Sequence, residues 1–275
     1  MFRREVAVAC TLTIFGWSVL EVLEVLSDDA PRDLDVLEVF SVSTSIVRCA
    51  HARGLSADSF DYTNNHQADV LTPHGFFQAT KMVLRLKAGA LLCLAPDCSS
   101  FSFPCIHWTK RKKGNFAGDE ENPKVRSGNL MARLSFWLLA LALARGVHVI
   151  FENPVNSSMF SFLKEHIDRL SEVPDCKLNY FYLPRCAYVE EKPTYKKTYK
   201  FMAVGQWLKQ AVQKCNCSVD HIPLMTSKKL PDGTVAKTGS DELKGSGLYP
   251  PKMGEAIFKA WQEFCKSSAV PQACT

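Results

Sequence analysis

The sequence predicts an α/β fold, a three-layer sandwich around a mostly parallel, Rossmann-like sheet with one antiparallel strand near the C-terminus. Strand-like and helix-like runs alternate along most of the chain. Two strand-like runs, ALLCLAP and VHVIFENP, are apolar on both faces, which is typical of parallel strands covered by helices on both sides. The 275 residues, of which 47% are hydrophobic, suffice to bury one such core.

The first half of the chain predicts a strand–helix–strand unit followed by a further helix and strand. VLEVFS is strand-like, and STSIVRCAHARG has helical spacing and ends at Gly54, a common helix terminator. GFFQATKMVLRLKAG also carries its apolar residues at helical spacing. The predicted elements are strands over 36–41, 56–62 and 90–96 and helices over 43–54 and 75–89.

The second half begins with a long polar segment from Ser99 to about Arg126, which predicts a loop because no apolar period defines an element there. A nearly all-round apolar helix follows, stops at Gly146 and leads into a strand. Two aromatic strands separated by a lysine-rich connection can then pair antiparallel. The predicted elements are helices over 127–146, 157–172 and 250–266 and strands over 147–154, 176–184 and 199–205.

Residues 1–32 are predicted to precede the main domain of residues 33–275. MFRR followed by an apolar run is typical of a targeting or anchor segment. We favour a helix packed on the domain, followed by a linker, because Glu21 and Glu24 interrupt a run that is already short for a membrane span. Eleven scattered cysteines lack the spacing of a secreted disulfide framework and favour reduced thiols in an intracellular protein, nuclear or cytoplasmic.

Polar residues follow four of the predicted strands at their carboxyl ends. In a doubly wound sheet these ends meet at one crevice, where ligands bind. A cysteine and a carboxylic acid facing one pocket can act as nucleophile and proton donor, because the thiolate attacks a polarised ring while the acid neutralises the developing charge. The residues expected at the crevice are Ser41, Asp61, Cys98, Glu152 and Asn153.

Two motifs resemble those of the cytosine-5 DNA methyltransferases. APDCSSFS is similar to the Pro-Cys-Gln-Ser-Phe-Ser loop of that family, and FENP is similar to its Glu-Asn-Val strand end, in the same order along the chain. The resemblance implies a methyltransferase sheet and S-adenosylmethionine as cofactor. It also implies that Cys98 is the nucleophile, which adds to C6 of a flipped-out cytosine, and that Glu152 is the acid that holds N3.

The same resemblance implies a cofactor site at the first strand ends. Glu38 stands at the family's acidic position, Asp61 would bind the ribose hydroxyls, and Asp69 would lie near the adenine. The cofactor residues expected on this basis are Glu38, Phe40, Ser41, Asp61, Asp69 and Pro96.

The turn after the first strand departs from the family pattern, because Val42, Thr44 and Ser45 stand where glycines are expected. A β-branched residue at positive φ costs about 1 kcal/mol or more, so either the turn differs or cofactor binding has been lost. Asp97 replaces a proline of the family loop, and its charge should raise the pKa of Cys98 and weaken the nucleophile.

The basic residues predict the side on which substrate binds. The KRKK run, with His107 and Trp108 as stacking groups, indicates a phosphate clamp for nucleic acid, with DNA favoured over RNA. Such a run is also typical of a solvated loop. The expected substrate-binding residues are Ser102, Lys110, Arg111, Asn153 and Lys192.

KCNCSVDH offers Cys215, Cys217 and His221 as metal ligands, and Cys176 or Cys186 would complete a set of four. The one-residue spacing between the first two cysteines is unlike that of ordinary structural zinc sites, so the sequence predicts no metal.

Three functions remain open on this basis. The first is an S-adenosylmethionine-dependent methyltransferase that acts on a nucleic-acid base, with Cys98 and Glu152 as its catalytic pair. The second is a catalytically inactive methyltransferase-like module that binds nucleic acid or protein. The third, a small-molecule methyltransferase that uses carboxylates alone, predicts that Cys98→Ala is harmless.

Overall fold

The structure is a computed structural model that describes residues 31–191, 193–218, 220–229, 235–239 and 247–268. The predicted N-terminal segment up to residue 30 and the expected substrate residue Lys192 lie outside the described residues.

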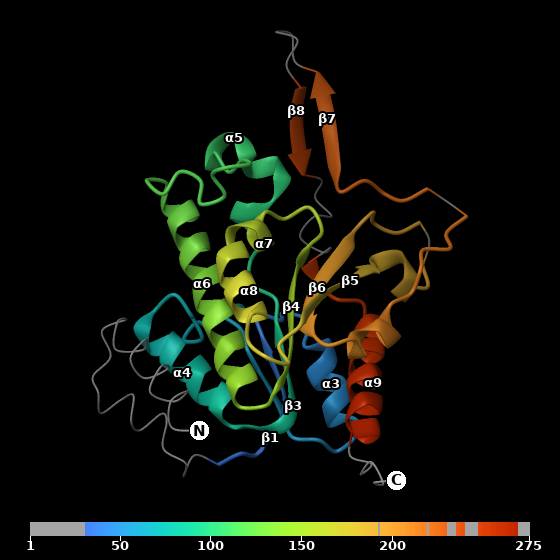
Figure 1. Cartoon of the computed structure of the whole chain (residues 1–275). Coiled ribbons are helices and arrows are strands. Elements are labelled where there is room, and N and C mark those ends of the chain that lie inside the picture. The colour runs from blue at the N-terminus through green and yellow to red at the C-terminus, as the bar shows by residue number, and fades with distance from the viewer. Residues whose placement is uncertain (1–30, 192, 219, 230–234, 240–246, 269–275) are drawn as a thin grey trace.

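A six-stranded mixed sheet forms the centre of the molecule, in the order β2-β1-β3-β4-β6-β5 (Figure 1). β1 pairs in parallel with β2 and β3, and β3 pairs in parallel with β4. β6 runs antiparallel between β4 and β5, which confirms the predicted antiparallel strand near the C-terminus. The strands are β1 Leu34–Val39, β2 Ala57–Phe60, β3 Leu86–Leu94, β4 His148–Pro154, β5 Leu178–Pro184 and β6 Thr198–Val204.

Helices cover both faces of this sheet, so the fold has the three layers that the sequence predicts. Figure 1 shows α4 (Pro73–Leu84), α6 (Pro123–Ala144), α7 (Met159–Phe162) and α8 (Lys164–Ser171) on one side. On the other side lie α3 (Ser45–His51) and the C-terminal helix α9 (Pro251–Ser268).

The two faces of the central strands supply two separate hydrophobic cores. In β3, Leu92 and Leu94 pack with the side chains of α4 and α6, whereas Leu91 and Cys93 pack with those of α3 and α9. Because successive side chains of a strand point to opposite faces, a strand between two helix layers must be apolar at every position. This is the physical reason for the continuous apolar run of ALLCL.

Glycine allows close packing of the C-terminal helix against the rest of the domain. A Cβ at Gly254 would lie 2.7 Å from the Oγ atom of Ser45, at the start of α3. α9 can therefore approach α3 closely, which holds the residues just before α9 beside the carboxyl end of the sheet.

The predicted boundary between the helix over 75–89 and the next strand is wrong. The helix predicted over 75–89 ends at Leu84, and residues 86–89 belong to β3, where Leu86 pairs with Leu34 of β1. The apolar residues of this stretch fit both helical and strand spacing, and pairing with β1 decides between the two.

The segment predicted as a loop from residue 99 to residue 126 contains three short helices and the start of α6. The short helices are the 3₁₀ helices η1 (Ser99–Phe101) and η2 (Phe103–Cys105) and the α-helix α5 (Ile106–Thr109). α6 begins at Pro123, four residues before the predicted start, because the Asn122 side chain accepts a hydrogen bond from the Lys124 backbone N–H.

α6 is long and apolar enough to cross a membrane by length and composition, with a mean hydropathy of 1.3 over its most apolar window. In this structure it packs on the sheet, and Leu134, Leu138 and Leu139 are buried in the core. It is therefore a core helix of the domain.

Two smaller features differ from the sequence prediction. The helix predicted over 157–172 is divided into α7 and α8. A hairpin of β7 (Met225–Lys229) and β8 (Val235–Gly239) was not predicted, and it extends away from the main sheet (Figure 1).

Candidate functional site

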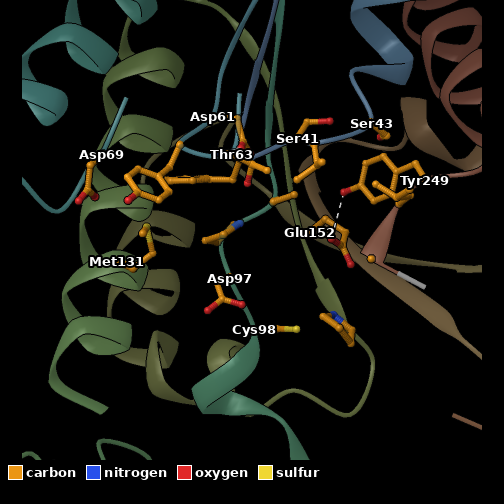
Figure 2. Close-up of a pocket in the computed structure, with 18 of the residues that line it drawn as sticks. Ser41, Ser43, Asp61, Thr63, Asp69, Asp97, Cys98, Met131, Glu152 and Tyr249 are labelled. Atoms are coloured by element: carbon orange, nitrogen blue, oxygen red, sulfur yellow. Dashed lines mark hydrogen bonds between the residues drawn. The ribbon is translucent and has the colours of Figure 1, made fainter. Parts of the chain in front are cut away.

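A cavity of about 570 Å³ lies at the carboxyl ends of β1, β2, β3 and β4 (Figure 2). In the sheet, β2 lies on one side of β1 and β3 lies on the other. The strand order therefore reverses at β1, next to the cavity. Ligands of open α/β sheets bind at such points. The lining includes Phe40, Ser41, Asp61, Asp69, Pro96, Cys98 and Glu152, all of which the sequence predicts as site residues.

Glu38 differs from the other predicted cofactor residues because it lies beneath the turn after β1 and not in the cavity lining. Its Oε1 accepts a hydrogen bond from the Ser41 hydroxyl at 2.8 Å, and its Oε2 accepts bonds from the backbone N–H groups of Ile46 and Val47. Burial raises the pKa of Glu38, and these hydrogen bonds oppose that shift. Glu38 thus connects the chain turn after β1 to the first helical turn of α3.

The turn itself adopts left-handed backbone conformations without glycine. Phe40 has a φ of 66° and Thr44 a φ of 45°. Such conformations cost non-glycine residues on the order of 1 kcal/mol each and tend to occur at functional sites. Of the three positions where the family pattern has glycine, Thr44 has a positive φ, whereas Val42 and Ser45 do not; the other strained residue is Phe40.

Asp61 and Asp69 line the cavity, and Figure 2 labels both. The Oδ1 atom of Asp61 accepts a hydrogen bond from the Thr63 backbone N–H, and that of Asp69 accepts one from the Leu71 N–H. Each aspartate therefore closes its own turn with one oxygen and can offer the second oxygen to a ligand.

Cys98 lies half-buried at the end of β3, just before η1. Burial raises the pKa of its thiol to about 12, and the nearby charges of Asp97 and Glu152 add to the shift. The Lys197 ammonium acts in the opposite direction. The thiol is therefore neutral near pH 7, as the charge of Asp97 led us to expect.

Glu152 lies at the end of β4 with only 7% of its surface exposed. Its Oε2 accepts a hydrogen bond from the Tyr249 hydroxyl at 3.0 Å, while its Oε1 has no hydrogen-bond partner among the described residues. Burial raises the pKa of Glu152 to about 7, although Lys197 and Tyr249 lower it. A buried oxygen without a partner is costly, and a ligand can supply the missing hydrogen bond.

Asn153 is completely buried and joins the ends of two neighbouring strands. Its Nδ2 donates to the backbone carbonyl of Pro96 at 3.0 Å, which ties the end of β4 to the loop that carries Cys98. The structure thus gives Asn153 a positioning contact and does not place it in the cavity lining, while the substrate contact that the sequence predicts stays a prediction.

Tyr249 and Lys197 are two of the lining residues that were not predicted as site residues from the sequence. Tyr249 precedes the two prolines at the start of α9, and Lys197 lies in the lysine-rich connection before β6. Nothing in the sequence around Tyr249 or Lys197 indicates that its side chain lies near Glu152, which is 45 or more residues away along the chain.

The predicted phosphate clamp is not formed as expected, because Arg111 is only 2% exposed. Its guanidinium donates to the backbone carbonyls of Ser100 and Phe116 and to Oδ1 of Asn129, and it stacks on the Phe101 ring at 3.7 Å. Burial lowers the pKa of Arg111 to about 10. Its role is to hold the loop that follows Cys98.

The other two described substrate candidates of this loop also make local contacts. Lys110 forms an ion pair with Asp119, and the hydroxyl of Ser102 donates to the Ser99 carbonyl. Neither residue lines the cavity. All three lysines of the KRKK run, Lys110, Lys112 and Lys113, are exposed.

Comparisons with known proteins add little to this geometry. No family model matches the chain, and none of the curated proteins matches it. Among solved structures, the chain is similar to the S. pombe Dnmt2 methyltransferase, with 13% sequence identity and a TM-score of 0.34. The likeness covers 62% of this chain and 49% of that protein, so the chain spans about half of its length. A TM-score of this size carries no argument about function.

Proposed function

We propose that the protein is an S-adenosylmethionine-dependent methyltransferase of the kind that acts on C5 of cytosine in nucleic acid. The observation that carries this proposal is the pairing of Cys98 with Glu152 in one cavity at the carboxyl ends of adjacent parallel strands. The resemblance of APDCSSFS and FENP to the family motifs supports the same chemistry.

The cavity fits the cofactor in size and lining. Its volume lies in the range of small-molecule pockets. The carboxylates of Asp61 and Asp69 can accept hydrogen bonds from ribose hydroxyls and from an adenine amine, and Phe40, Leu71 and Met131 offer an apolar wall for a ring. When bound there, S-adenosylmethionine would supply the methyl group.

Cys98, Glu152 and Tyr249, which also line the cavity, would act on the base. Cys98 Sγ would bond to C6 of the ring after its thiol loses its proton to solvent, a loss that the charge of Lys197 favours. Glu152, half-protonated near pH 7, would donate a proton from Oε1 to N3 while Tyr249 holds Oε2. The electrons of the C5–C6 double bond would move into the ring, where the proton on N3 neutralises their charge. After C5 gains the methyl group, loss of the C5 proton to solvent would restore the double bond and release the Cys98 thiolate.

A 5-fluorocytosine trap tests the catalytic pair. Oligonucleotides containing this base, as DNA and as RNA, are incubated with the protein and S-adenosylmethionine. After methyl transfer, fluorine cannot leave C5 as a proton would, so Cys98 stays bonded to C6. The expected result is a covalent adduct on Cys98 by mass spectrometry. Cys98→Ala abolishes it, and the matched control Cys105→Ala, at another half-buried cysteine of the same loop, retains it. Absence of an adduct, or an adduct that survives Cys98→Ala, contradicts the proposal.

A specific observation favours a second candidate function, a catalytically inactive binding module. The thiol of Cys98 is neutral near pH 7, because burial and Asp97 raise its pKa to about 12. Such a module would bind nucleic acid without S-adenosylmethionine, through exposed cations such as Lys112 and Lys113, with affinity that falls as salt rises. Fluorescence anisotropy at two salt concentrations, with and without S-adenosylmethionine, separates this candidate from the first.

A further inference from the structure

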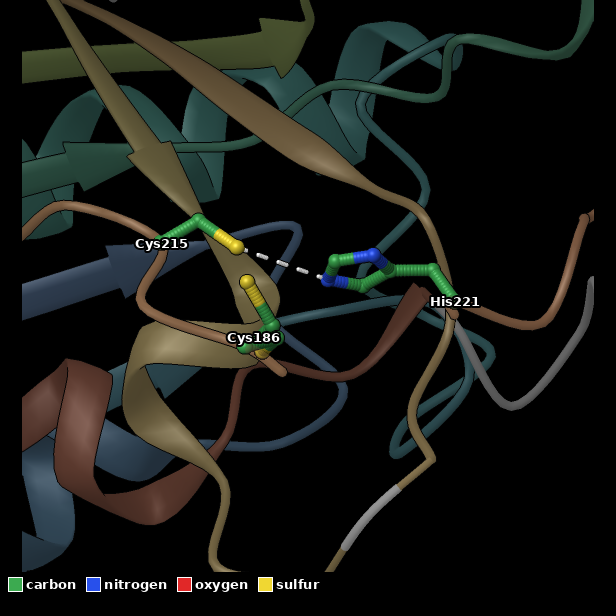
Figure 3. A group of neighbouring side chains, drawn as sticks. Cys186, Cys215 and His221 are labelled. Atoms are coloured by element: carbon green, nitrogen blue, oxygen red, sulfur yellow. Dashed lines mark hydrogen bonds between the residues drawn. The ribbon is translucent and has the colours of Figure 1, made fainter. Parts of the chain in front are cut away.

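A second group of chemically active side chains lies outside the cavity. Cys186, Cys215, Cys217 and His221 each offer one ligand atom, and these atoms lie within 4.8 Å of one another. The Sγ of Cys215 and the Nε2 of His221 are 3.6 Å apart (Figure 3). We propose that these four residues bind a structural zinc ion.

The ligand set and the distances between the ligand atoms suit zinc, although only one residue separates Cys215 from Cys217 in the sequence. Tetrahedral coordination with Zn–S bonds of about 2.3 Å requires ligand atoms about 3.8 Å apart, so the group needs to contract by no more than about 1 Å. Three thiolates and one imidazole form a common structural ligand set. Because four protein ligands fill the coordination shell, the ion would have no open position for a substrate or an attacking water.

Three chain segments bring the ligands together. Cys186 lies in the 3₁₀ helix η3 (Arg185–Tyr188), directly after β5, and Cys215 and Cys217 follow the 3₁₀ helix η4 (Trp207–Ala211). The Tyr188 hydroxyl donates to the Ala211 carbonyl and accepts from the Gln213 N–H at 3.1 Å, which ties the first segment to the second. These contacts involve none of the ligand atoms.

Backbone pairing positions the fourth ligand. Next to His221, the Ile222 N–H donates to the Thr194 carbonyl at 2.9 Å, and the Lys196 N–H donates to the Ile222 carbonyl at 2.9 Å. His221 is thereby held beside the connection that leads to β6. The four ligands therefore occupy a site that the surrounding chain already shapes.

The ion would stabilise a part of the fold that has little regular structure. Residues 212–218 and 220–221 belong to no described helix or strand. In such segments a bound metal ion can stabilise the fold in place of a hydrophobic core, because the free energy of metal binding adds to the free energy of folding. Arg185, next to Cys186, donates to the Leu248 carbonyl at 2.6 Å, so the same ion would also support the segment that carries Tyr249.

Metal analysis of the full-length protein tests this site. The protein is purified under reducing conditions, incubated with zinc, freed of unbound metal and analysed by elemental mass spectrometry. The expected content is about one zinc ion per chain. Cys217→Ala and His221→Ala should lose the ion, whereas the controls Cys176→Ala and Cys265→Ala, which remove cysteines outside the group, should retain it.

A conservative variant guards against loss of metal through misfolding. His221→Cys retains a fourth ligand, so it should still bind metal, and its cobalt-substituted form should show stronger thiolate-to-cobalt charge transfer than the wild type. The proposal is overturned if the wild-type protein contains no zinc after this treatment, or if Cys217→Ala contains as much zinc as the wild type. A Cys186–Cys215 or Cys186–Cys217 disulfide that persists under the reducing conditions also overturns it, because a disulfide consumes two of the ligands.

Discussion

At the scale of single residues, Glu152 is the clearest example of a side chain whose environment sets its chemistry. It is buried at a strand end, with Tyr249 on one carboxyl oxygen and no described partner on the other. Burial favours the uncharged acid, which is the form that can donate a proton. The pKa of about 7 makes this acid available under ordinary conditions.

Glu152 should make stability depend on pH in a direction that can be worked out. Below its ordinary pKa of 4.5 the group is protonated in both the folded and the unfolded chain. As pH rises from there to about 7, the unfolded chain loses the proton while the folded chain keeps it, so the free energy of unfolding falls. The contribution lost is about 3 kcal/mol.

Urea denaturation at about pH 5 and about pH 8 measures this effect. Glu152→Gln, which cannot titrate, should unfold with a weaker dependence on pH than the wild type. The control Glu121→Gln, at an exposed site, should retain the wild-type dependence. Equal pH dependence in Glu152→Gln and the wild type contradicts the assigned environment.

Tyr249 should influence the same titration. Its hydroxyl donates to the Glu152 carboxylate and lowers the pKa of that acid. Tyr249→Phe removes this hydrogen bond and should move the pH-dependent loss of stability to higher pH. The same urea series on the variant measures the shift, and an unchanged pH range counts against a role for Tyr249.

At the scale of elements, the loop after β3 depends on contacts with α6. Arg111 bridges η1, the backbone around residue 116 and Asn129 of α6. Gly128 allows the close approach, because a Cβ there would lie 2.1 Å from the Ser100 Oγ. The position of Cys98 thus depends on residues that do not line the cavity.

Arg111→Met should destabilise the protein by about 2–4 kcal/mol, because it leaves buried carbonyl groups without donors. Chemical denaturation measures the loss, and hydrogen exchange over residues 99–102 should rise with it. Lys112→Met removes the neighbouring, exposed cation and should change neither quantity. If both variants behave alike, the buried network is not what holds the loop.

Gly128→Ala should cost about 1–3 kcal/mol through overpacking against Ser100. The exposed neighbour Ser127→Ala, on the same helix, is the control and should have little effect. Adding Ser100→Ala to Gly128→Ala removes the clashing hydroxyl and should recover part of the loss. Chemical denaturation of the single and double variants measures these free energies of unfolding. If Ser100→Ala does not reduce the loss caused by Gly128→Ala, a clash with the Ser100 hydroxyl is not its cause.

Elements with one unambiguous periodicity could be predicted from the sequence, and those without it could not. β3 and β4 are apolar on both faces, so their place inside a parallel sheet follows from ALLCL and VIF. The boundary between α4 and β3 was missed because Leu84 and Leu86 fit a helix and a strand equally well. The early start of α6 depends on the Asn122 cap, a single local hydrogen bond.

At the scale of the whole molecule, the candidate site is a product of sheet topology. The rule that strand ends converge was enough to bring Cys98, Glu152 and Asp61 to one cavity. It could not locate Tyr249 or Lys197, because the packing of α9 and the path of the connection before β6 decide where they lie. Likewise, the burial of Arg111 depends on partners up to 18 residues away.

The central claim is that this cavity binds S-adenosylmethionine, and isothermal titration calorimetry of the full-length protein tests it most directly. The account predicts one binding site per chain and about tenfold weaker binding in Asp61→Asn, because that change weakens an acceptor for the ribose hydroxyls. Asp58→Asn, at an exposed position of β2, should bind as the wild type does. No heat of binding at high protein concentration, or equal affinity in all three proteins, would contradict the account.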